Sequence, residues 1–584
     1  MSVKENIREV TFEELQARKV YGKVSPENQA KINATYQNIK DVENLLGKRI
    51  VNLSDFDADG ICSALIIKKI FPNCETIIGD RFKDGYGIPN VSLQQGDLVI
   101  CTDIGSSDLE KINILTQQTN IAPFIVDHHE KTKDIKLYAQ LNNRKVLNFT
   151  GDENAPDYCG TGLALKLYEC HYVNLMAQGF PAEDLAKELN TVKVFGMIGT
   201  VADMVSVNNI NDENRTIIEN GFQVLRDVYA GKAEIDETLR CFLEMANLDE
   251  TLNNITTMKI GYHIAPLLNA CGRLEEYGGQ KAFNILSTPL FDENGKVNVK
   301  VLEGLEYIKE VNQKRKDRMD EIMHTPSMEE AIKQAKESAD NVVVIINTDI
   351  EQGLTGLIAN RIKDATDKPT IVLTEAQGSE GKVLVGSGRN MDGYPSLYQM
   401  GQSDLCIKAG GHEGAIGLSI NRSDVDDYKK ELVEKYKDID VTIEKEYLKD
   451  WQNFTYEQYL ALEPYGTDFP VPTICTDAIK IENRQGLPAK APKAEWACTK
   501  VDIDGTKVKF TDFGKATEWN VGSVIRFLAQ PSYNEWTSPK TGKTTISLDY
   551  LVSSVQDGVI KELDKSNVNL PKDDKAQSQG QTKA

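Results

Sequence analysis

The stretch Arg49–Phe71, RIVNLSDFDADGICSALIIKKIF, joins a short apolar run to three aspartates at alternate positions, a glycine and a longer apolar segment. The first run has the length and composition of a buried β-strand, and the last segment is typical of a packed helix. The aspartates therefore lie where a strand ends and a helix begins. In open parallel α/β sheets, ligands and catalytic groups collect at this edge.

The spacing of Asp55, Asp57 and Asp59 before Gly60 is also how a calcium-binding EF-hand loop begins. Such a loop needs a bidentate glutamate at its twelfth position, which counted from Asp55 is the apolar Ile66. This excludes the EF-hand and leaves either another kind of metal site or an acidic turn.

The surrounding sequence predicts an α/β fold with a doubly wound, mainly parallel sheet over the first ~210 residues. Its strands are RIVNLSD, CETIIGD, DLVICTDIG and IAPFIVDHH. A charged helix from about Lys300 to Met323 is expected to join this domain to a second, smaller α/β domain, which starts at NVVVIIN and ends at KAGGHEGAIGLSI. Short β-like runs with Gly and Pro turns from about Tyr447 to Val555 predict a small barrel.

Composition narrows the class of protein. The formal charge of −21 argues against indiscriminate nucleic-acid binding through bulk charge, so a polyanionic substrate must be held locally. Two local features suit that role: a balance of +3 over residues 480 to 515, and four tryptophans confined to the final third of the chain. A solvated lysine-rich face and core packing are their simpler explanations.

No apolar run could span a bilayer, the N-terminus lacks the apolar core of a signal peptide, and the ten cysteines form no CxxC pair. We therefore expect a cytoplasmic protein with reduced thiols.

Further acids and histidines follow the other predicted strands. Asp127, His128 and His129 end one strand, Asp103 ends another, and Asp203 lies in the apolar run GMIGTVADMV. Each alone could be a strand-end cap, an Asx turn or a satisfied core group. Together they crowd one sheet edge, where two carboxylates ~4 Å apart repel by roughly 4 kcal/mol at an effective dielectric near 20. Such a cluster needs cations, and carboxylates with imidazoles and no cysteine suit one or two Mn²⁺ or Mg²⁺ ions.

These motifs resemble a known family. DFDADG, CTDIG, VDHH and GTVADMV, in this order, are similar to the four motifs of the DHH phosphoesterase superfamily. DRFKDGYG, DENR, IAPLLNACGRL, GSGRN, GGHEGAIG and LEPYGTDFPVP are similar to the RecJ-type single-strand DNA exonucleases, in which the last segment opens an OB-like terminal domain. The resemblance runs from about residue 48 to 555.

The resemblance implies roles for individual residues. The implied metal ligands are Asp55, Asp57, Asp59, Asp103, His128 and Asp203, with Asp103 bridging two ions. The implied catalytic residues are Asp103, His128 and His129, of which His129 contacts the scissile phosphate or assists proton transfer. The implied substrate-binding residues are Arg81, Asn269, Arg273, Ser387, Arg389 and His412. Which of the first three aspartates binds which ion stays open, and a surface ion pair is the alternative for Arg81 and Arg389.

Two departures from the family pattern stand out. Ile350-Glu351 replaces a Trp-His pair before QGLTG, and Gly388 stands in GSGR where the family has alanine. We expect Gly388 to loosen a turn that presents Arg389.

The resemblance also implies domains and an activity. The domains are residues 1–225 (DHH catalytic, with an N-terminal extension), 226–338 (helical segment and linker helix), 339–440 (substrate-binding α/β), 441–563 (OB-like β-barrel) and 564–584 (disordered tail). The activity is 5′ to 3′ hydrolysis of single-stranded DNA to 5′-mononucleotides, in recombination, repair or replication. The expected protein is monomeric, is not bound to membranes and is supplied with single strands by a single-strand-binding protein or helicase. The alternatives are a phosphodiesterase of oligoribonucleotides or cyclic dinucleotides, and a non-catalytic replication scaffold.

Overall fold

The computed structural model describes residues 3–46, 49–85, 87–131, 134–136, 145–246, 255–439, 441–487, 496–503, 506–512, 519–537 and 541–557. The chain forms two compact units. Unit 1 is Gln16–Ile439 with Leu460–Val471, and unit 2 is Ser2–Leu15, Asp440–Tyr459 and the chain from Pro472.

The first sheet of unit 1 confirms the predicted parallel arrangement. Its five strands lie in the order β3-β2-β4-β5-β6, and every neighbouring pair is parallel. They are β2 (Ile50–Ser54), β3 (Glu75–Ile78), β4 (Leu98–Thr102), β5 (Phe124–Val126) and β6 (Val146–Leu147). Because Ser54 is opposite Thr102, and Thr102 is opposite Val126, the three central strands end at one edge.

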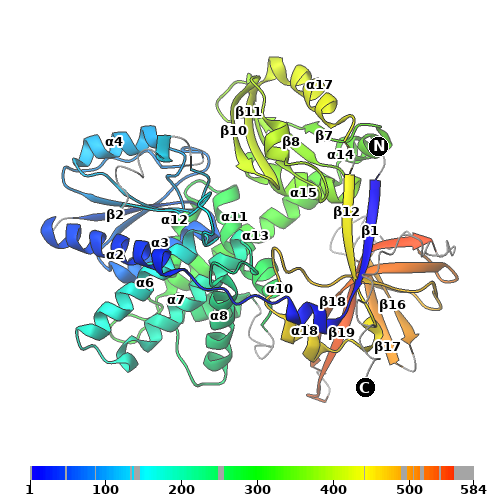
Figure 1. The fold of residues 1–584 in the computed structure, drawn as a ribbon, viewed down its shortest axis with the longest axis horizontal. Coiled ribbons are helices and arrows are strands. Elements are labelled where there is room, and N and C mark those ends of the chain that lie inside the picture. The colour runs from blue at the N-terminus through cyan, green and yellow to red at the C-terminus, as the bar shows by residue number, and fades with distance from the viewer. Residues whose placement is uncertain are drawn as a thin grey trace, which may run out of the picture. The chain divides into compact units, whose positions relative to one another are not determined.

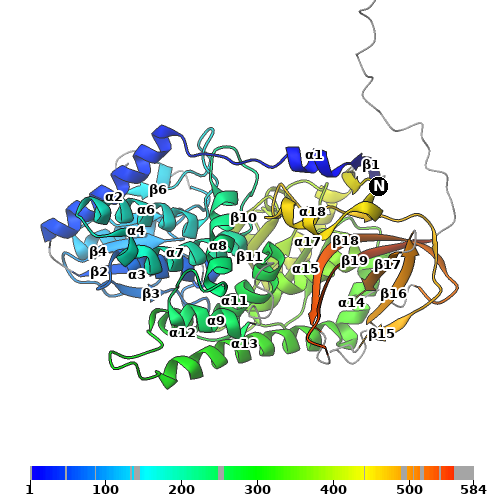
Figure 2. The same cartoon turned by 90° about the horizontal axis from the view of Figure 1, so that it is seen from below.

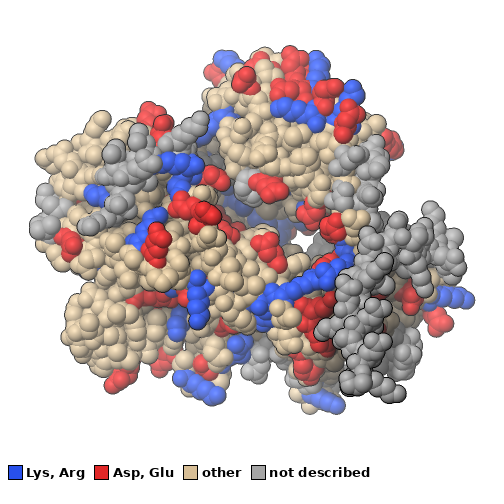
Figure 3. Space-filling model, in the orientation of Figure 1, with Lys and Arg blue, Asp and Glu red and all other residues tan. Residues whose placement is uncertain are grey.

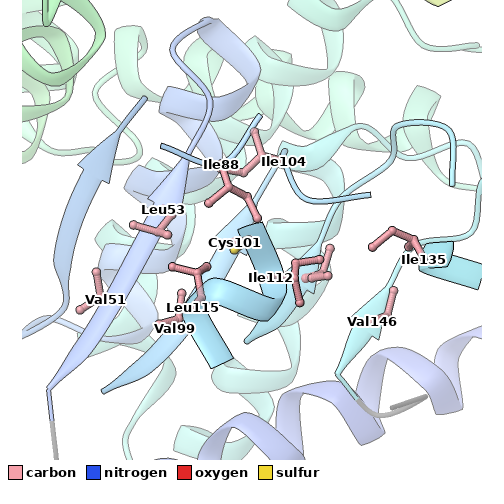
Figure 4. Packing of buried hydrophobic residues seen from close by; sticks show 11 residues of the cluster. Val51, Leu53, Ile88, Val99, Cys101, Ile104, Ile112, Leu115, Ile135 and Val146 are labelled. Carbon is pink, nitrogen blue, oxygen red and sulfur yellow. The ribbon is translucent and has the colours of Figure 1, made fainter. Parts of the chain in front are cut away.

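Helices cover both faces of this sheet, as the doubly wound prediction requires. Alternate strand residues such as Leu53 and Cys101 point to one face, where α4 (Leu109–Thr119) packs through Ile112 and Leu115 (Figure 4). Figure 1 shows α4 on one side of the sheet and α2 (Pro26–Leu46) and α3 (Ala58–Ile70) on the other. Helix α3 is buried on almost every side, and Ile66 is 0% exposed within it, which agrees with the exclusion of an EF-hand loop.

A helical segment separates the two sheets of unit 1. Its helices are α6 (Gly160–Ala177), α7 (Ala182–Asp203), α8 (Asn214–Tyr229), α9 (Glu237–Met245), α10 (Thr257–Lys259), the π-helix η2 (Ile260–Ile264), α11 (Ala265–Leu274) and α12 (Gly278–Ser287). The predicted linker helix is α13 (Val299–Met323), which Figure 2 shows as one long rod packed against α9, α11 and α12. Helix α14 (Pro326–Glu337) follows it.

The second sheet of unit 1 has the order β10-β11-β9-β8-β7. Its elements are β7 (Val343–Ile346), η3 (Gln352–Leu354), α15 (Thr355–Thr366), β8 (Thr370–Glu375), β9 (Val383–Arg389), α16 (Leu397–Gly401), β10 (Cys406–His412), β11 (Ala415–Asn421), η4 (Arg422–Asp424) and α17 (Val425–Tyr436). The pair β7–β8 is parallel and the other pairs are antiparallel. This is the smaller α/β domain that the sequence predicts.

Unit 2 is rich in β-structure. Strands β1 (Val3–Val10) and β12 (Val441–Leu448) pair in parallel, and a seven-stranded sheet has the order β13-β18-β19-β17-β16-β15 with β14 beside β18. Its strands are β13 (Ile474–Cys475), β14 (Ile479–Lys480), β15 (Gln485–Leu487), β16 (Trp496–Ile503), β17 (Thr506–Asp512), β18 (Val524–Thr537) and β19 (Thr544–Asp557), and the remaining elements of the chain are α1 (Phe12–Ala17), η5 (Trp451–Asn453) and α18 (Tyr456–Leu462). An OB-like barrel stays a prediction, as do the domain boundaries, and the expected tail lies outside the described residues.

Two tryptophans of unit 2 lie in its core. Trp451 is 5% exposed and packs edge-on against Phe510 and Tyr550, while Trp519 is 1% exposed and packs edge-on against Phe527. Core packing is thus the role of these two rings, and the side chains of Trp496 and Trp536 lie outside the described residues.

All ten cysteines are free thiols, and no helix in the described ranges has the length and hydropathy needed to cross a bilayer.

Candidate metal centre

The predicted acids gather at the carboxyl edge of the first sheet. Asp55 directly follows β2, Asp103 follows β4 and Asp127 follows β5, so the strand register brings them together. Asp103 adopts a left-handed backbone conformation, with φ of 59°, and its N–H donates to the Val126 carbonyl at 2.9 Å. This conformation is uncommon for a residue with a side chain, and such strain concentrates at functional sites.

Hydrogen bonds fix the aspartate loop on the first turn of α3. The Asp57 carboxylate caps the helix by accepting from the N–H groups of Asp59 and Gly60 at 3.0 and 3.1 Å. The two Asp59 oxygens accept from the N–H groups of Gly160 and Thr161, both at 2.8 Å, at the start of α6. Asp57 and Asp59 are therefore held by local structure before any ion binds.

Asp127 orients the two histidines rather than joining the metal ligands. One of its oxygens accepts from the backbone N–H of His128 at 2.7 Å and lies 2.8 Å from Nδ1 of His129, while the other accepts from the Ser106 N–H. Burial raises the pKa of Asp127, but the two histidines and the Ser106 hydrogen bond lower it by more, so this carboxylate stays charged.

Nε2 of His128 faces three carboxylates. It lies 3.2 Å from Oδ1 of Asp103, 3.6 Å from Oδ2 of Asp203 and 3.7 Å from Oδ2 of Asp59. Both Nε2 of His128 and Oδ1 of Asp103 are buried, and neither has a hydrogen-bond partner within the described part of the chain. Buried polar atoms are rarely left unpaired, so this pair of atoms fits a bound cation.

The electrostatics of the cluster also favour cations. Burial, reinforced by the neighbouring aspartates, raises the pKa of Asp103 and of Asp203 well above the usual range for a carboxyl group. Burial and then Asp57 raise the pKa of Asp55 to about 7. These shifts show that the carboxylates are costly to charge together, and a divalent ion removes that cost.

Three groups of three side chains could each hold a metal ion, because within each group the ligand atoms lie within 4.8 Å of one another. They are Asp55, Asp57 and Asp103; Asp59, His128 and Asp203; and Asp103, His128 and His129. The chain thus has clusters that could hold metal ions. The grouping places Asp55 and Asp57 with Asp103, and Asp59 with His128 and Asp203, which the sequence left open. Asp103 belongs to two groups, as a bridging ligand would.

His129 differs from His128 in its exposure and charge. Its side chain is 54% exposed, and its ring centre lies 4.6 Å from that of His128. Burial lowers its pKa, but Asp127 and then Asp55 and Asp203 raise it to about 10, so His129 is a cation at neutral pH.

Three of the six predicted substrate-binding residues, Ser387, Arg389 and Arg273, contact the segment around the N-terminal end of α15. A Cβ on Gly356 would come within 2.8 Å of the Arg389 guanidinium, and Ser387 Oγ is 3.4 Å from Thr355 Oγ1. Arg273, in the last turn of α11, donates to the Gly353 carbonyl at 3.2 Å. His412 ends β10, next to its hairpin turn, and its side chain lies outside the described residues.

The other two predicted substrate residues lie beside the aspartate loop. The Arg81 guanidinium is 4.7 Å from the Phe56 ring centre, and it acts to lower the pKa of Asp55. Oδ1 of Asn269 accepts from the Ala58 N–H at 2.8 Å, so Asn269 holds the start of α3 in place. A lone asparagine in a helical segment carries no sequence signal for that contact.

The two departures from the family pattern have structural explanations. Ile350 is 3% exposed within the core below the second sheet, and Glu351 pairs with Arg318 at 2.7 Å. The expectation that Gly388 loosens a turn is wrong, because Val383–Arg389 is strand β9 and a Cβ on Gly388 would meet Ile416, Ile371 and Leu397 at 2.8 to 2.9 Å.

Sequence reasoning missed several residues that shape these sites. Gly160 is the clearest case, because a Cβ there would lie 2.6 Å from the Cβ of Asp103. Gly353, Thr355 and Gly356 around the start of α15 are others, although the QGLTG stretch that contains them was a visible signal. No local pattern connects Gly160 with Asp103, which lies 57 positions earlier.

Replacing Gly160 with alanine should weaken metal binding about 10- to 100-fold, because the new methyl group displaces Asp103 from its neighbours. Calorimetric titration with Mn²⁺ measures the change. Gly486→Ala is the matched control, since a Cβ there meets nothing within 4 Å. Equal Mn²⁺ affinity in both variants would show that Gly160 has no part in shaping the centre.

The loop that follows Asp203 is held by hydrogen bonds with Leu460–Val471, a segment distant in the sequence. Thr467 Oγ1 donates to the Met204 carbonyl at 2.5 Å, and the Val207 N–H donates to the Thr467 carbonyl at 3.1 Å. Arg215 is 2% exposed and donates to the carbonyls of Val20 and Pro464. The segment LEPYGTDFPVP was expected to open the terminal domain, but Leu460–Val471 belongs to unit 1 because these contacts hold it there.

Glu463, which lies in the segment Leu460–Val471, should make the stability of the fold depend on pH. Burial raises its pKa to about 7, against hydrogen bonds from Thr257 and Tyr465 that lower it. The raised pKa contributes stability in full below pH ~4.5, and this contribution is lost as pH rises through about 7. The free energy of unfolding of wild type should therefore fall by about 2.5 kcal/mol relative to that of Glu463→Gln between pH 5 and pH 8.5. Urea unfolding at both pH values measures this. The exposed Glu13→Gln should track wild type, and a parallel pH response of Glu463→Gln and wild type would contradict the prediction.

The family model described as DHH family, N-terminal domain, matches residues 49–197, which contain most of the ligands above. The Single-stranded-DNA-specific exonuclease RecJ of Dickeya dadantii is 26% identical over 406 residues, which is 66% of this chain and 66% of that protein. The protein of the same name from Bacillus subtilis is 25% identical over 534 residues, which is 87% of this chain and 62% of that protein.

Residues 49–197 thus match the DHH family, and the chain as a whole is similar to RecJ-type proteins. Among solved structures, this chain is similar in fold to RecJ from Thermus thermophilus, solved with Mn²⁺ or with Mg²⁺. The TM-scores are 0.67 and 0.63 at 17% identity, and the matches cover 95% of this chain and 80% and 78% of those chains. The chain spans slightly less than two thirds of the length of the Dickeya and Bacillus relatives.

Proposed function

We propose that this chain is a metal-dependent exonuclease of single-stranded DNA that works from 5′ to 3′ and releases 5′-mononucleotides. The observation that carries the proposal is the buried and half-buried cluster of five aspartates and His128, in which the buried atoms Oδ1 of Asp103 and Nε2 of His128 lack partners among the described residues. The substrate follows from the relatives, which are named single-stranded-DNA-specific exonucleases.

The ligand set fits Mn²⁺ or Mg²⁺, and two such ions would lower the pKa of a bound water and stabilise charge on the leaving oxygen. The chain itself positions the reacting groups. Asp103 is shared between the two groups of ligands, and the hydrogen bonds to Asp57 and Asp59 keep the carboxylates from reorganising. Nδ1 of His129 faces Asp127, so Nε2 of this cation is available to contact a phosphate oxygen or to protonate the leaving oxygen.

A second set of groups suits the 5′-terminal phosphate. Ser387, Arg389 and Thr355 surround the start of α15, which has 12 residues and presents backbone N–H groups and the positive end of its dipole. The arginine fork matches phosphate in a bidentate manner. Holding the terminal phosphate here while the adjoining phosphodiester lies at the metal centre sets the 5′ to 3′ direction.

The proposed substrate must be bound by such local groups, because bulk charge does not attract it. The chain carries −21 overall, and on the face shown in Figure 3 Lys and Arg side chains are interspersed with Asp and Glu. We propose a monomer that receives single strands from a single-strand-binding protein or a helicase during recombination, repair or replication.

Incubation with Mn²⁺ and 5′-labelled single-stranded DNA, duplex DNA or RNA tests the proposal. Mononucleotides should appear from single-stranded DNA and not from the duplex. Faster cleavage of short RNA would favour an oligoribonucleotide phosphodiesterase, and a chain that binds DNA without cleaving any of the three would be a scaffold.

Replacing Arg389 with alanine should lower the preference for 5′-phosphorylated over 5′-hydroxyl DNA about 10- to 100-fold, which is the factor expected from one charged hydrogen-bonding partner. Arg389→Lys should restore only part of it, since lysine lacks the bidentate fork. The exposed Arg422 of the same domain supplies the control Arg422→Ala, which should behave as wild type. An unchanged preference in Arg389→Ala would remove Arg389 from the phosphate site.

A further inference from the structure

Tyr262 is the most exposed large apolar side chain of unit 1 within the described residues, at 73%. It lies in η2, a π-helical turn of five residues between α10 and α11. Its side chain makes no hydrogen bond, ion pair or ring contact with the residues that the structure describes. Packing therefore does not explain the aromatic ring, and π-turns occur frequently at functional sites.

The turn that carries Tyr262 packs against α7, the helix that ends at the candidate ligand Asp203. A Cβ on the adjacent Gly261 would be 3.8 Å from Val201 Cγ1, two residues before Asp203. The residue after Asp203, Met204, is 72% exposed. An exposed aromatic ring and an exposed thioether thus come from two elements that pack together.

The helix that follows Tyr262 contacts both candidate sites. Asn269 contacts the aspartate loop, and Arg273, in the last turn of α11, lies beside α15. Tyr262 therefore lies just before the N-terminal end of a helical rod whose later residues contact the aspartate loop and the start of α15.

Two lysines lie near the turn that carries Tyr262. Burial and then Lys316 and Lys259 lower the pKa of His263, which places both ammonium groups within electrostatic reach of the residue after Tyr262. In a chain with a formal charge of −21, this pairing of cations with an exposed ring is the combination that binds single-stranded nucleic acid.

We infer that the Tyr262 ring stacks against one nucleobase of the single strand whose phosphodiester lies at the metal centre. The inference rests on the proposed function and names a subsite for its substrate. A base stacks on the ring whatever its identity, so the contact is independent of sequence. A base within a duplex already stacks on its neighbours on both faces, so stacking on Tyr262 favours single strands.

Binding of a 5′-phosphorylated oligonucleotide in EDTA, where no cleavage occurs, tests the inference. Tyr262→Ala should weaken binding about 5- to 150-fold, the range for loss of one base–aromatic stack, and Tyr262→Phe should bind as wild type. One abasic position, moved along the strand, should weaken wild-type binding by a similar factor at a single site. At that site it should have no effect on Tyr262→Ala, because the two changes remove the same contact.

The control is Phe180→Ala. Phe180 is 48% exposed and precedes α7, whose 22 residues separate it from Asp203 by roughly 30 Å. Its removal should change neither binding nor the abasic profile. If wild type cleaves single-stranded DNA but Tyr262→Ala shows the wild-type abasic profile, the stacking role of Tyr262 is excluded and the proposed function stands. If wild type neither binds nor cleaves single strands, both are overturned.

Discussion

Replacing Asp103 with asparagine lowers the rate of phosphodiester cleavage at least about 10³-fold, the expected result if this residue is shared between two metal sites. Its side chain is 1% exposed, and it lies with Asp55 and Asp57 in one group of ligand atoms and with His128 in another. Loss of one shared carboxylate weakens both groups, and the ions supply several kcal/mol of stabilisation to the transition state. Each 1.36 kcal/mol is a tenfold change in rate.

The fold of this variant should remain intact. Asparagine has the same shape as aspartate, and it removes one charge from a site where burial and neighbouring aspartates oppose ionisation. The Tm in EDTA should therefore equal or exceed that of wild type, and binding of single-stranded DNA in EDTA should persist. Single-turnover cleavage, thermal unfolding and a binding titration together measure these outcomes.

Glu110→Gln is the matched control for Asp103→Asn, because Glu110 is exposed on the next helix, α4, and also loses one negative charge. Its cleavage rate should equal that of wild type. Retention of cleavage by Asp103→Asn would exclude the proposed two-metal centre, whereas an equal loss in Glu110→Gln would point to bulk charge instead.

Removal of divalent ions should abolish cleavage and lower the Tm of unit 1. The ligands crowd together in the folded chain, and an ion that binds only this state stabilises it by about 2.7 kcal/mol when its free concentration is a hundred times its Kd. Wild type dialysed against EDTA should thus unfold a few degrees lower than the same protein in Mn²⁺. Adding Mn²⁺ back should restore both activity and Tm.

The response to Mn²⁺ should be smaller than wild type in Asp57→Asn and smaller still in Asp103→Asn, because Asp57 belongs to one of the three groups of ligand atoms and Asp103 to two. Differential scanning calorimetry over a series of Mn²⁺ concentrations measures this order. Equal gains in Tm for wild type and both variants would place the stabilising ion elsewhere on the chain.

The fold and the gathering of the candidate metal ligands at one sheet edge were predictable to a large extent because their signals are local. A buried strand followed by acids and an apolar helix is visible in Arg49–Phe71, and the strands that end at Asp103 and Asp127 repeat the pattern. Parallel strands place their carboxyl ends at one edge, so the acids could be brought together without coordinates. Only the assignment of Asp55, Asp57 and Asp59 to separate groups required the structure.

The contacts that hold the centre were not predictable, because each joins residues that no periodicity connects. Gly160 packs against Asp103, Asn269 binds the aspartate loop from 211 positions away, and Thr467 donates to the Met204 carbonyl from 263 positions away. The sequence by itself determined which acids and histidines gather at the sheet edge, through local composition and the geometry of parallel sheets. Only the tertiary structure decided which backbone and side-chain groups orient them, because those choices depend on the packing of distant segments and are made once for the folded chain.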